Sequence, residues 1–291
     1  MKNSTVITVV LLTLFVAISS HAIDEIRFEK GQSASDVRMA HKLEILHTAM
    51  DKTIPDYGPY TISADVTLNT LRAQLAIQEG KTINVYIALT DNIWEKIAIP
   101  IRIPIRRGIL NYRLLLVHRD DLPLFREVQT IEDLKRLKAG LLHFWTTTKI
   151  MQQTGFNIIT ASNYDGLFKM LDSHRFNYLP RGINEIFAEF EQYKPTLKNI
   201  AIEPDLLLVI PTPSYIFVSP QYPRLAQRLK KGLEIMIHDG TFEAIFNKYF
   251  AANIKRANLH NRRILRLTNP LLPQETPLNR SELWFDPLKE K

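Results

Sequence analysis

One segment, residues 175–185, holds the densest group of side chains suited to binding a ligand. An apolar run predicts a strand that ends in a turn fixed by Pro180, followed by a helix that starts near Gly182. A helix start carries partial positive charge, and the guanidinium of Arg181 matches a carboxylate. The alternative is a structural ion pair between Arg181 and Glu185 or Glu189. The predicted anion-binding residues of this segment are Arg181, Asn184 and Glu185.

A second group of polar residues, Trp145, Thr146 and Thr147, stands at another predicted strand-to-helix turn. Hydroxyl and N–H groups at such a turn can hold a carboxylate or a phosphate. The alternative is ordinary capping of the helix by Thr146.

Three further residues complete the predicted ligand-binding set: Thr90, Trp94 and Arg106. Trp94 follows a polar loop, where its ring would stack on a ligand or pack in a core. Thr90 belongs to the polar loop before Trp94, and Arg106 stands at the start of the first predicted crossover between two lobes.

Motifs of catalysis and metal binding are absent from the sequence. It has neither a G-x-S-x-G elbow nor an H-E-x-x-H helix. Without cysteine it has no disulfides, thiolate metal sites or cysteine nucleophiles, and we expect no metal and no cofactor. Glu95, Glu185 and His143 are the only acid–base candidates near the predicted cleft. We therefore expect a protein that is not an enzyme.

Short apolar runs alternate with helical patterns, which indicates an α/β fold. Isoleucines alternate with other residues over 97–107, and Pro100 and Pro104 predict an edge or crossover strand there. Extended segments at 106–112 and 208–215 predict two crossovers between two lobes, with a cleft between them. The predicted lobes are 23–107 plus 212–252 for the first and 108–211 for the second.

The two ends of the chain differ from its body. Residues 1–22 have a lysine, an apolar run and small residues before a cleavage site, which predicts a secretory signal peptide and export to the periplasm. The formal charge is +7, and much of it lies in the tail, 253–291, which also contains prolines. We expect this tail to wrap over the surface without a core of its own, because the helical pattern dissolves after Ala252. Export argues against nucleic acid as a partner, and we expect a monomer.

Several motifs resemble those of one protein family. Asp239-Gly240-Thr241-Phe242 and Phe246-Asn247-Lys248-Tyr249-Phe250 are similar to those of bacterial extracellular solute-binding proteins of family 3. The branch known as transporter substrate-binding-domain proteins is resembled by residues 162–171, 176–185 and 101–105, and by Gly108, Tyr112 and Arg113. The resemblance covers about residues 26–250. It implies a two-lobed periplasmic-binding-protein-like (Venus flytrap) fold with two crossover segments.

The amino-acid site of that family departs here in two places. Its receptors place an Arg shortly after a Thr before the first crossover, whereas Thr90 is followed by Trp94, Glu95 and Lys96. They also place an Asp at a strand end of the second lobe, and Asn177 stands in what we take as that region. A buried ligand charge without a partner costs several kcal/mol, so an ordinary α-amino acid is not the expected ligand.

The resemblance implies a periplasmic solute-binding protein. We expect it to capture a small polar solute, amino-acid-like or an organic anion, between its lobes for an inner-membrane ABC permease or a membrane sensor. Two alternatives stay open: a module that has lost ligand binding and serves protein interaction, and a dehydratase-like enzyme on the same fold.

Overall fold

The computed structural model describes residues 23–31 and 38–287. The predicted signal peptide, 1–22, lies outside the described residues. Within the described ranges, no helix combines the length and apolarity needed to cross a membrane.

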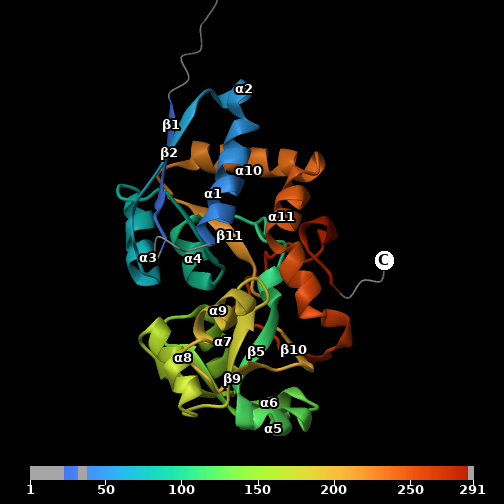
Figure 1. Cartoon of the computed structure of the whole chain (residues 1–291). Helices are drawn as coiled ribbons and strands as arrows, with labels where there is room; N and C mark the ends of the chain where they lie inside the picture. Colours follow the sequence, from blue (N-terminus) through green and yellow to red (C-terminus); the bar gives the residue numbers. More distant parts are fainter. Residues whose placement is uncertain (1–22, 32–37, 288–291) are drawn as a thin grey trace, which may run out of the picture.

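The molecule has two lobes, one above the other in Figure 1. Lobe 1 denotes the part built on strands β1 to β4 and β11. Its parallel pair is β1 (Asp24–Glu29) with β2 (Tyr60–Val66). Its antiparallel sheet has the order β3 (Val85–Leu89), β11 (Ser214–Val218), β4 (Ile99–Ile101). The expected edge strand is thus confirmed in β4, although it is only three residues long.

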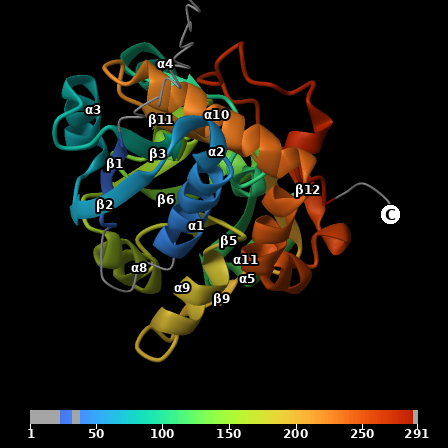
Figure 2. The same cartoon turned by 90° about the horizontal axis from the view of Figure 1, so that it is seen from above.

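Helices of lobe 1 cover these strands: α1 (Arg38–Asp51), α2 (Ile54–Tyr57), α3 (Thr70–Glu79), α4 (Asn92–Ile97) and α10 (Pro223–His238). Helices α1 and α10 lie side by side in both Figure 1 and Figure 2. At Gly232 of α10, a Cβ atom would lie 2.0 Å from the backbone oxygen of Ala49 in α1. Only glycine therefore permits this close approach.

Lobe 2 denotes the part built on β5 to β10 and β12. Its mixed sheet has the order β12 (Arg263–Arg266), β10 (Leu206–Val209), β5 (Tyr112–His118), β8 (Tyr178–Gly182), β6 (Lys138–Leu142), β7 (Asn157–Ala161), and β9 (Ile200–Ile202) also pairs with β5. The helices around it are α5 (Leu122–Arg126), α6 (Ile131–Arg136), α7 (Thr146–Gln153), α8 (Tyr164–Asp172) and α9 (Ile186–Tyr193). Helix α11 (Thr241–Ala257) packs on both lobes, since Phe242 joins the core of lobe 1 and Phe250 that of lobe 2.

The prediction of a turn at Pro180 was wrong. Pro180 lies inside β8, opposite Leu115 of β5, and the strand continues to Gly182. Among the described residues, β8 pairs with β6 at Tyr178, two residues before Pro180. Proline lacks a backbone N–H, and it is tolerated here because the pairing with β6 has already ended. Helix α9 starts at Ile186 rather than near Gly182.

The prediction that the helical pattern dissolves after Ala252 was also wrong. Helix α11 continues to Ala257, and β12 then pairs in parallel with β10. The reason is the burial of Leu265 of β12 in the lobe 2 core. This apolar contact stabilises the strand, whereas the prediction assumed a tail without core residues. The tail also contacts both connections between the lobes: Phe285 N–H donates to the Arg107 carbonyl at 2.7 Å, and Leu267 N–H donates to the Val209 carbonyl at 2.9 Å.

Candidate functional site

A cavity of about 210 Å³ lies between the lobes and is lined by residues of both. Sites for drug-sized ligands span ~300–1,000 Å³, so this cavity fits a small solute. The structure places eight of the predicted ligand-binding residues in its wall: Trp94, Arg106, Trp145, Thr146, Thr147, Arg181, Asn184 and Glu185. Thr90 does not line it. That side chain is buried, and its Oγ1 donates to Glu95 Oε1 at 2.9 Å.

Arg181 reaches the cavity wall but is held by carboxylates of its own lobe. Its Nε donates to Glu189 Oε2 at 2.7 Å and its Nη2 to Glu189 Oε1 at 2.5 Å. Glu185 Oε2 lies 3.1 Å from the same Nη2, and the guanidinium stacks 4.7 Å from the ring centre of Trp145. Burial opposes the charge, but Glu185 and Glu189 raise the pKa of Arg181 well above its usual value. The structural ion pair considered as the alternative is therefore present.

Arg113, which the motifs did not single out as a site residue, lines the same cavity. It comes from the start of β5 and is only 4 % exposed. Its Nη2 donates to Thr212 Oγ1 at 3.4 Å, a long contact, and its Nε has no hydrogen-bond partner among the described residues. Burial lowers the pKa of Arg113 to about 10, against the raising effect of Glu185. Arg113 therefore lines the cavity with a guanidinium that has one donor, Nε, left without an acceptor among the described residues.

The first turn of α7 also faces the cavity through Thr146 and Thr147. Capping by Thr146 is not observed: the helix begins at Thr146, and its N-cap residue, Trp145, makes no side-chain cap hydrogen bond. The third hydroxyl of this run, on Thr148, donates to the Leu142 carbonyl at 2.6 Å. The helix start thus has no capping side chain, and polar groups there are placed for an external acceptor.

Aromatic rings form the rest of the wall. Trp94 is 1 % exposed and stacks on Tyr86 with ring centres 5.0 Å apart. It also packs 5.2 Å from Phe217, so most of the ring belongs to the core of lobe 1. Phe144 and Trp145 line the cavity from lobe 2. A ligand here would meet apolar surface as well as charge.

Comparisons with known proteins find similarity in structure only, since no family model and no curated protein matches the chain. An ancestral arginine-binding protein bound to arginine superposes with a TM-score of 0.52 and 21% identity, over 72% of this chain and 87% of that one. An arginine-specific periplasmic binding protein of Salmonella typhimurium gives 0.51 and 14%, over 78% and 99%. A structure from work on glutathione import in Streptococcus mutans gives 0.55 and 10%, over 79% and 96%.

This chain has the two-lobed fold of periplasmic binding proteins. The predicted fold class is thereby confirmed, and the family resemblance is confirmed at the level of the fold. Periplasmic binding proteins close two lobes around a ligand by hinge motion. The cavity described above occupies the space between the two lobes of this fold.

Asn177 does not occupy the cleft of this periplasmic-binding-protein fold, so the comparison of Asn177 with the family's Asp was wrong. Its Nδ2 donates to Asp121 Oδ2 at 2.9 Å, and its Oδ1 accepts from Lys138 N–H at 2.8 Å. It precedes β8, whereas the cavity residues Asn184 and Glu185 follow that strand. The five residues of β8 separate the two positions, so Asn177 lies at the opposite end of the strand from the cavity.

The three acid–base candidates do not converge. Glu95 binds Thr90 and, at 2.7 Å, Arg102; His143 is exposed; and only Glu185 lines the cavity. Within the described ranges, no group of three or more His, Asp and Glu residues is arranged to hold a metal ion.

Proposed function

We propose that this protein is an exported solute-binding protein that captures a small polar solute between its lobes for an ABC importer or a membrane sensor. The observation that carries the proposal is the cavity between the lobes, to which both lobes contribute charged and aromatic side chains. A ligand that contacts both lobes stabilises the closed arrangement by its differential affinity for it. The periplasmic-binding-protein fold supports the same role.

The lost-binding alternative is less well supported by the cavity wall. Burying a guanidinium without a full set of partners costs roughly several kcal/mol, and an apolar side chain in its place is often neutral or stabilising. A cleft without a ligand gains nothing from Arg113, which is buried and whose Nε has no acceptor in the part of the chain that the structure describes. Its presence favours a ligand that completes its hydrogen bonds.

Thermal unfolding of the mature protein against a panel of solutes tests the proposal. A ligand at one hundred times its dissociation constant stabilises the folded state by about 2.7 kcal/mol. This corresponds to a rise in melting temperature on the order of 5–10 °C for a chain of this size. Trp94 and Trp145 line the cavity from opposite lobes, so tryptophan fluorescence should change in the same titration. If amino acids, organic acids, polyamines and sugars all leave both signals unchanged, solute capture is contradicted.

A further inference from the structure

Resting on the proposed function, we propose that the solute is a small organic anion whose carboxylate binds the guanidinium of Arg113 beside the first turn of α7. This assigns the anion to Arg113, a residue of β5, and not to Arg181.

The two arginines of the cavity wall differ in what already occupies them. Arg181 donates twice to Glu189 and has Glu185 3.1 Å away, so its planar donor fork is filled. Arg113 has one contact, of 3.4 Å, to Thr212, and its buried Nε is unbonded among the described residues. An incoming carboxylate therefore gains more from Arg113, where it would complete hydrogen bonds that the protein leaves unmade.

The charge of the cavity wall also favours an anion. Among the described residues, four cationic side chains and two carboxylates line it: Lys42, Arg106, Arg113 and Arg181, with Glu29 and Glu185. Both carboxylates already have cationic partners: Glu29 Oε1 lies 2.5 Å from Lys42 Nζ, and Glu185 Oε2 lies 3.1 Å from Arg181 Nη2. A cationic solute such as arginine would add to a positive excess in a region of reduced dielectric constant. The expected selectivity is thus opposite in charge to that of the arginine-binding proteins of the same fold.

Shape and composition narrow the anion to a carboxylic acid with an apolar part. The cavity is about 210 Å³, and Tyr86, Phe144 and Trp145 contribute rings to its wall. Inorganic phosphate has no apolar surface to place against those rings, whereas a short carbon chain or ring would cover them. The uncapped start of α7 adds N–H groups and hydroxyls that suit a carboxylate oxygen.

The test measures binding by calorimetry and melting curves for the wild-type mature protein with succinate, glutamate, lactate, benzoate, inorganic phosphate and arginine. Arg113→Met is the decisive variant, Arg113→Lys keeps charge without the fork, and Arg256→Met is the matched control. Arg256 is a half-exposed arginine that pairs with Glu191 outside the cavity. We expect at least one carboxylate to bind the wild type. We expect Arg113→Met to lower that affinity roughly ten- to hundredfold while the unliganded variant melts no lower than wild type. The control should bind as wild type.

Each arm separates this inference from the proposed function. Binding of arginine or phosphate without any carboxylate would overturn the carboxylate assignment and leave solute capture intact. Undiminished carboxylate affinity in Arg113→Met would overturn the role of Arg113, as would a lower melting temperature with affinity reduced only in proportion. If Arg113→Met does not fold, wild-type affinity in Arg113→Lys overturns the bidentate clamp and weakened affinity supports it. Absence of any solute binding contradicts the proposed function itself.

Discussion

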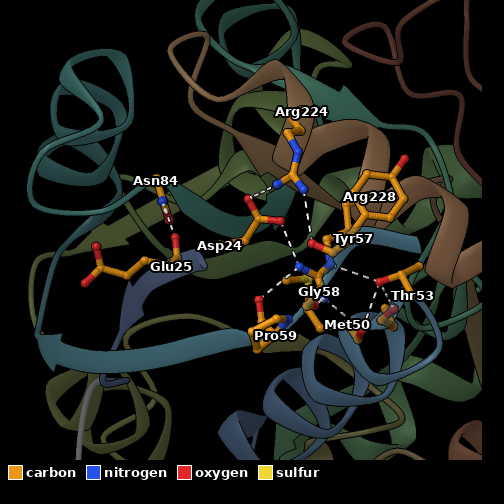
Figure 3. A network of polar contacts seen from close by, with 11 residues as sticks. Asp24, Glu25, Met50, Thr53, Tyr57, Gly58, Pro59, Asn84, Arg224 and Arg228 are labelled. Atoms are coloured by element: carbon orange, nitrogen blue, oxygen red, sulfur yellow. Dashed lines mark hydrogen bonds and ion pairs between the residues drawn. The ribbon is translucent and has the colours of Figure 1, made fainter. Parts of the chain in front are cut away.

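Arg228 and Arg113 are both buried guanidinium groups, one inside lobe 1 and the other at the cleft, and their surroundings differ. Arg228, on α10, is fully buried, and Figure 3 shows its donors directed at five oxygens. The acceptors are Asp24 Oδ2 at 2.8 Å, Thr53 Oγ1 at 3.0 Å, and the carbonyls of Gly58 at 2.6 Å, Met50 at 3.4 Å and Pro59 at 3.4 Å. By contrast, the guanidinium of Arg113 has one hydrogen bond within residues 23–31 and 38–287, a long one of 3.4 Å to Thr212 Oγ1.

The number of acceptors around each guanidinium distinguishes a structural arginine from a ligand-binding one. A buried cation whose donors all have acceptors holds segments of the chain together, as Arg228 joins α10 to β1 and to Gly58 at the end of α2. A buried cation that faces a cavity with unused donors costs stability and is explained by something that binds there. Burial alone does not distinguish the two.

The largest effect is expected for Arg228→Met. Its loss removes a donor from the carbonyls of Gly58 and Pro59 and from the Thr53 hydroxyl oxygen, whereas the Met50 carbonyl keeps its hydrogen bonds from Thr53. Among the described residues, Asp24 is left with Arg224 as its ion-pair partner. Removing one member of a buried ion pair costs about 3–5 kcal/mol, and we expect the upper part of that range. Urea unfolding measures it. Arg224→Met is the control, because Arg224 pairs with the same Asp24 from a 44 % exposed position and should cost at most about 1 kcal/mol.

An equal loss of unfolding free energy in Arg224→Met and Arg228→Met would contradict the structural role of Arg228. Its five hydrogen bonds would then contribute no more stability than a surface ion pair. Ligand affinity at the cleft should be unchanged in both variants, since neither residue lines the cavity.

A smaller loss, of about 3 kcal/mol, is expected for Arg181→Ala. The variant leaves the Glu189 carboxylate, whose residue is 7 % exposed, with the Tyr164 hydroxyl as its remaining side-chain hydrogen-bond donor among the described residues. Because Arg181 is structural in this comparison, solute affinity should fall only as far as the folded fraction does. Arg181→Lys should lose less, since it keeps the charge but not the bidentate fork. If Arg181→Ala instead abolishes solute binding while melting like the wild type, Arg181 is a ligand-binding residue, as proposed for Arg113.

Local sequence signals were reliable where neighbouring residues determine the structure. A glycine directly after the helical pattern of residues 68–79 predicts a helix end, and Gly80 ends α3 in the left-handed conformation, at φ 67°. The T-x-x-D spacing of Thr130 and Asp133 predicts a helix start, and the two residues form a capping box at the start of α6. The failures at Pro180 and after Ala252 depend on partners distant in sequence: the end of the β6 ladder in one case and the free edge of β10 in the other.

The site was predictable in part for the same reason. Turns after strands marked Thr146, Thr147, Asn184 and Glu185, and the structure places all of them at one cavity. Arg113 was missed because an arginine at the start of an apolar strand has the pattern of a surface residue. Its burial follows from the central position of β5, which pairs with strands on both sides. Such a position becomes visible only when the sheet order is known.

The smallest expected effect concerns His41 of α1, a buried base beside the cationic wall of the cleft. It is 2 % exposed, and neither ring nitrogen has a hydrogen-bond partner among the described residues. Its ring packs against Tyr249 and Phe250 at 5.3 and 5.0 Å. Burial, with smaller effects of Arg106 and Lys42, lowers the pKa of His41 well below its usual 6.5.

The sign of the pH effect follows from proton uptake. Below about pH 6.5 the unfolded chain binds a proton at His41 that the folded chain does not, so the free energy of unfolding falls as the pH falls. One proton contributes up to about 1.4 kcal/mol per pH unit. His41→Phe should remove this contribution, so its urea midpoint should change less than that of wild type between pH 7 and pH 5. A variant that keeps the full wild-type slope would show that His41 takes up its proton in the folded state. The cationic wall of the cleft would then accommodate a further positive charge on His41. That result would weaken the contrast between the positively charged cleft and Arg228, whose charge is paired with Asp24.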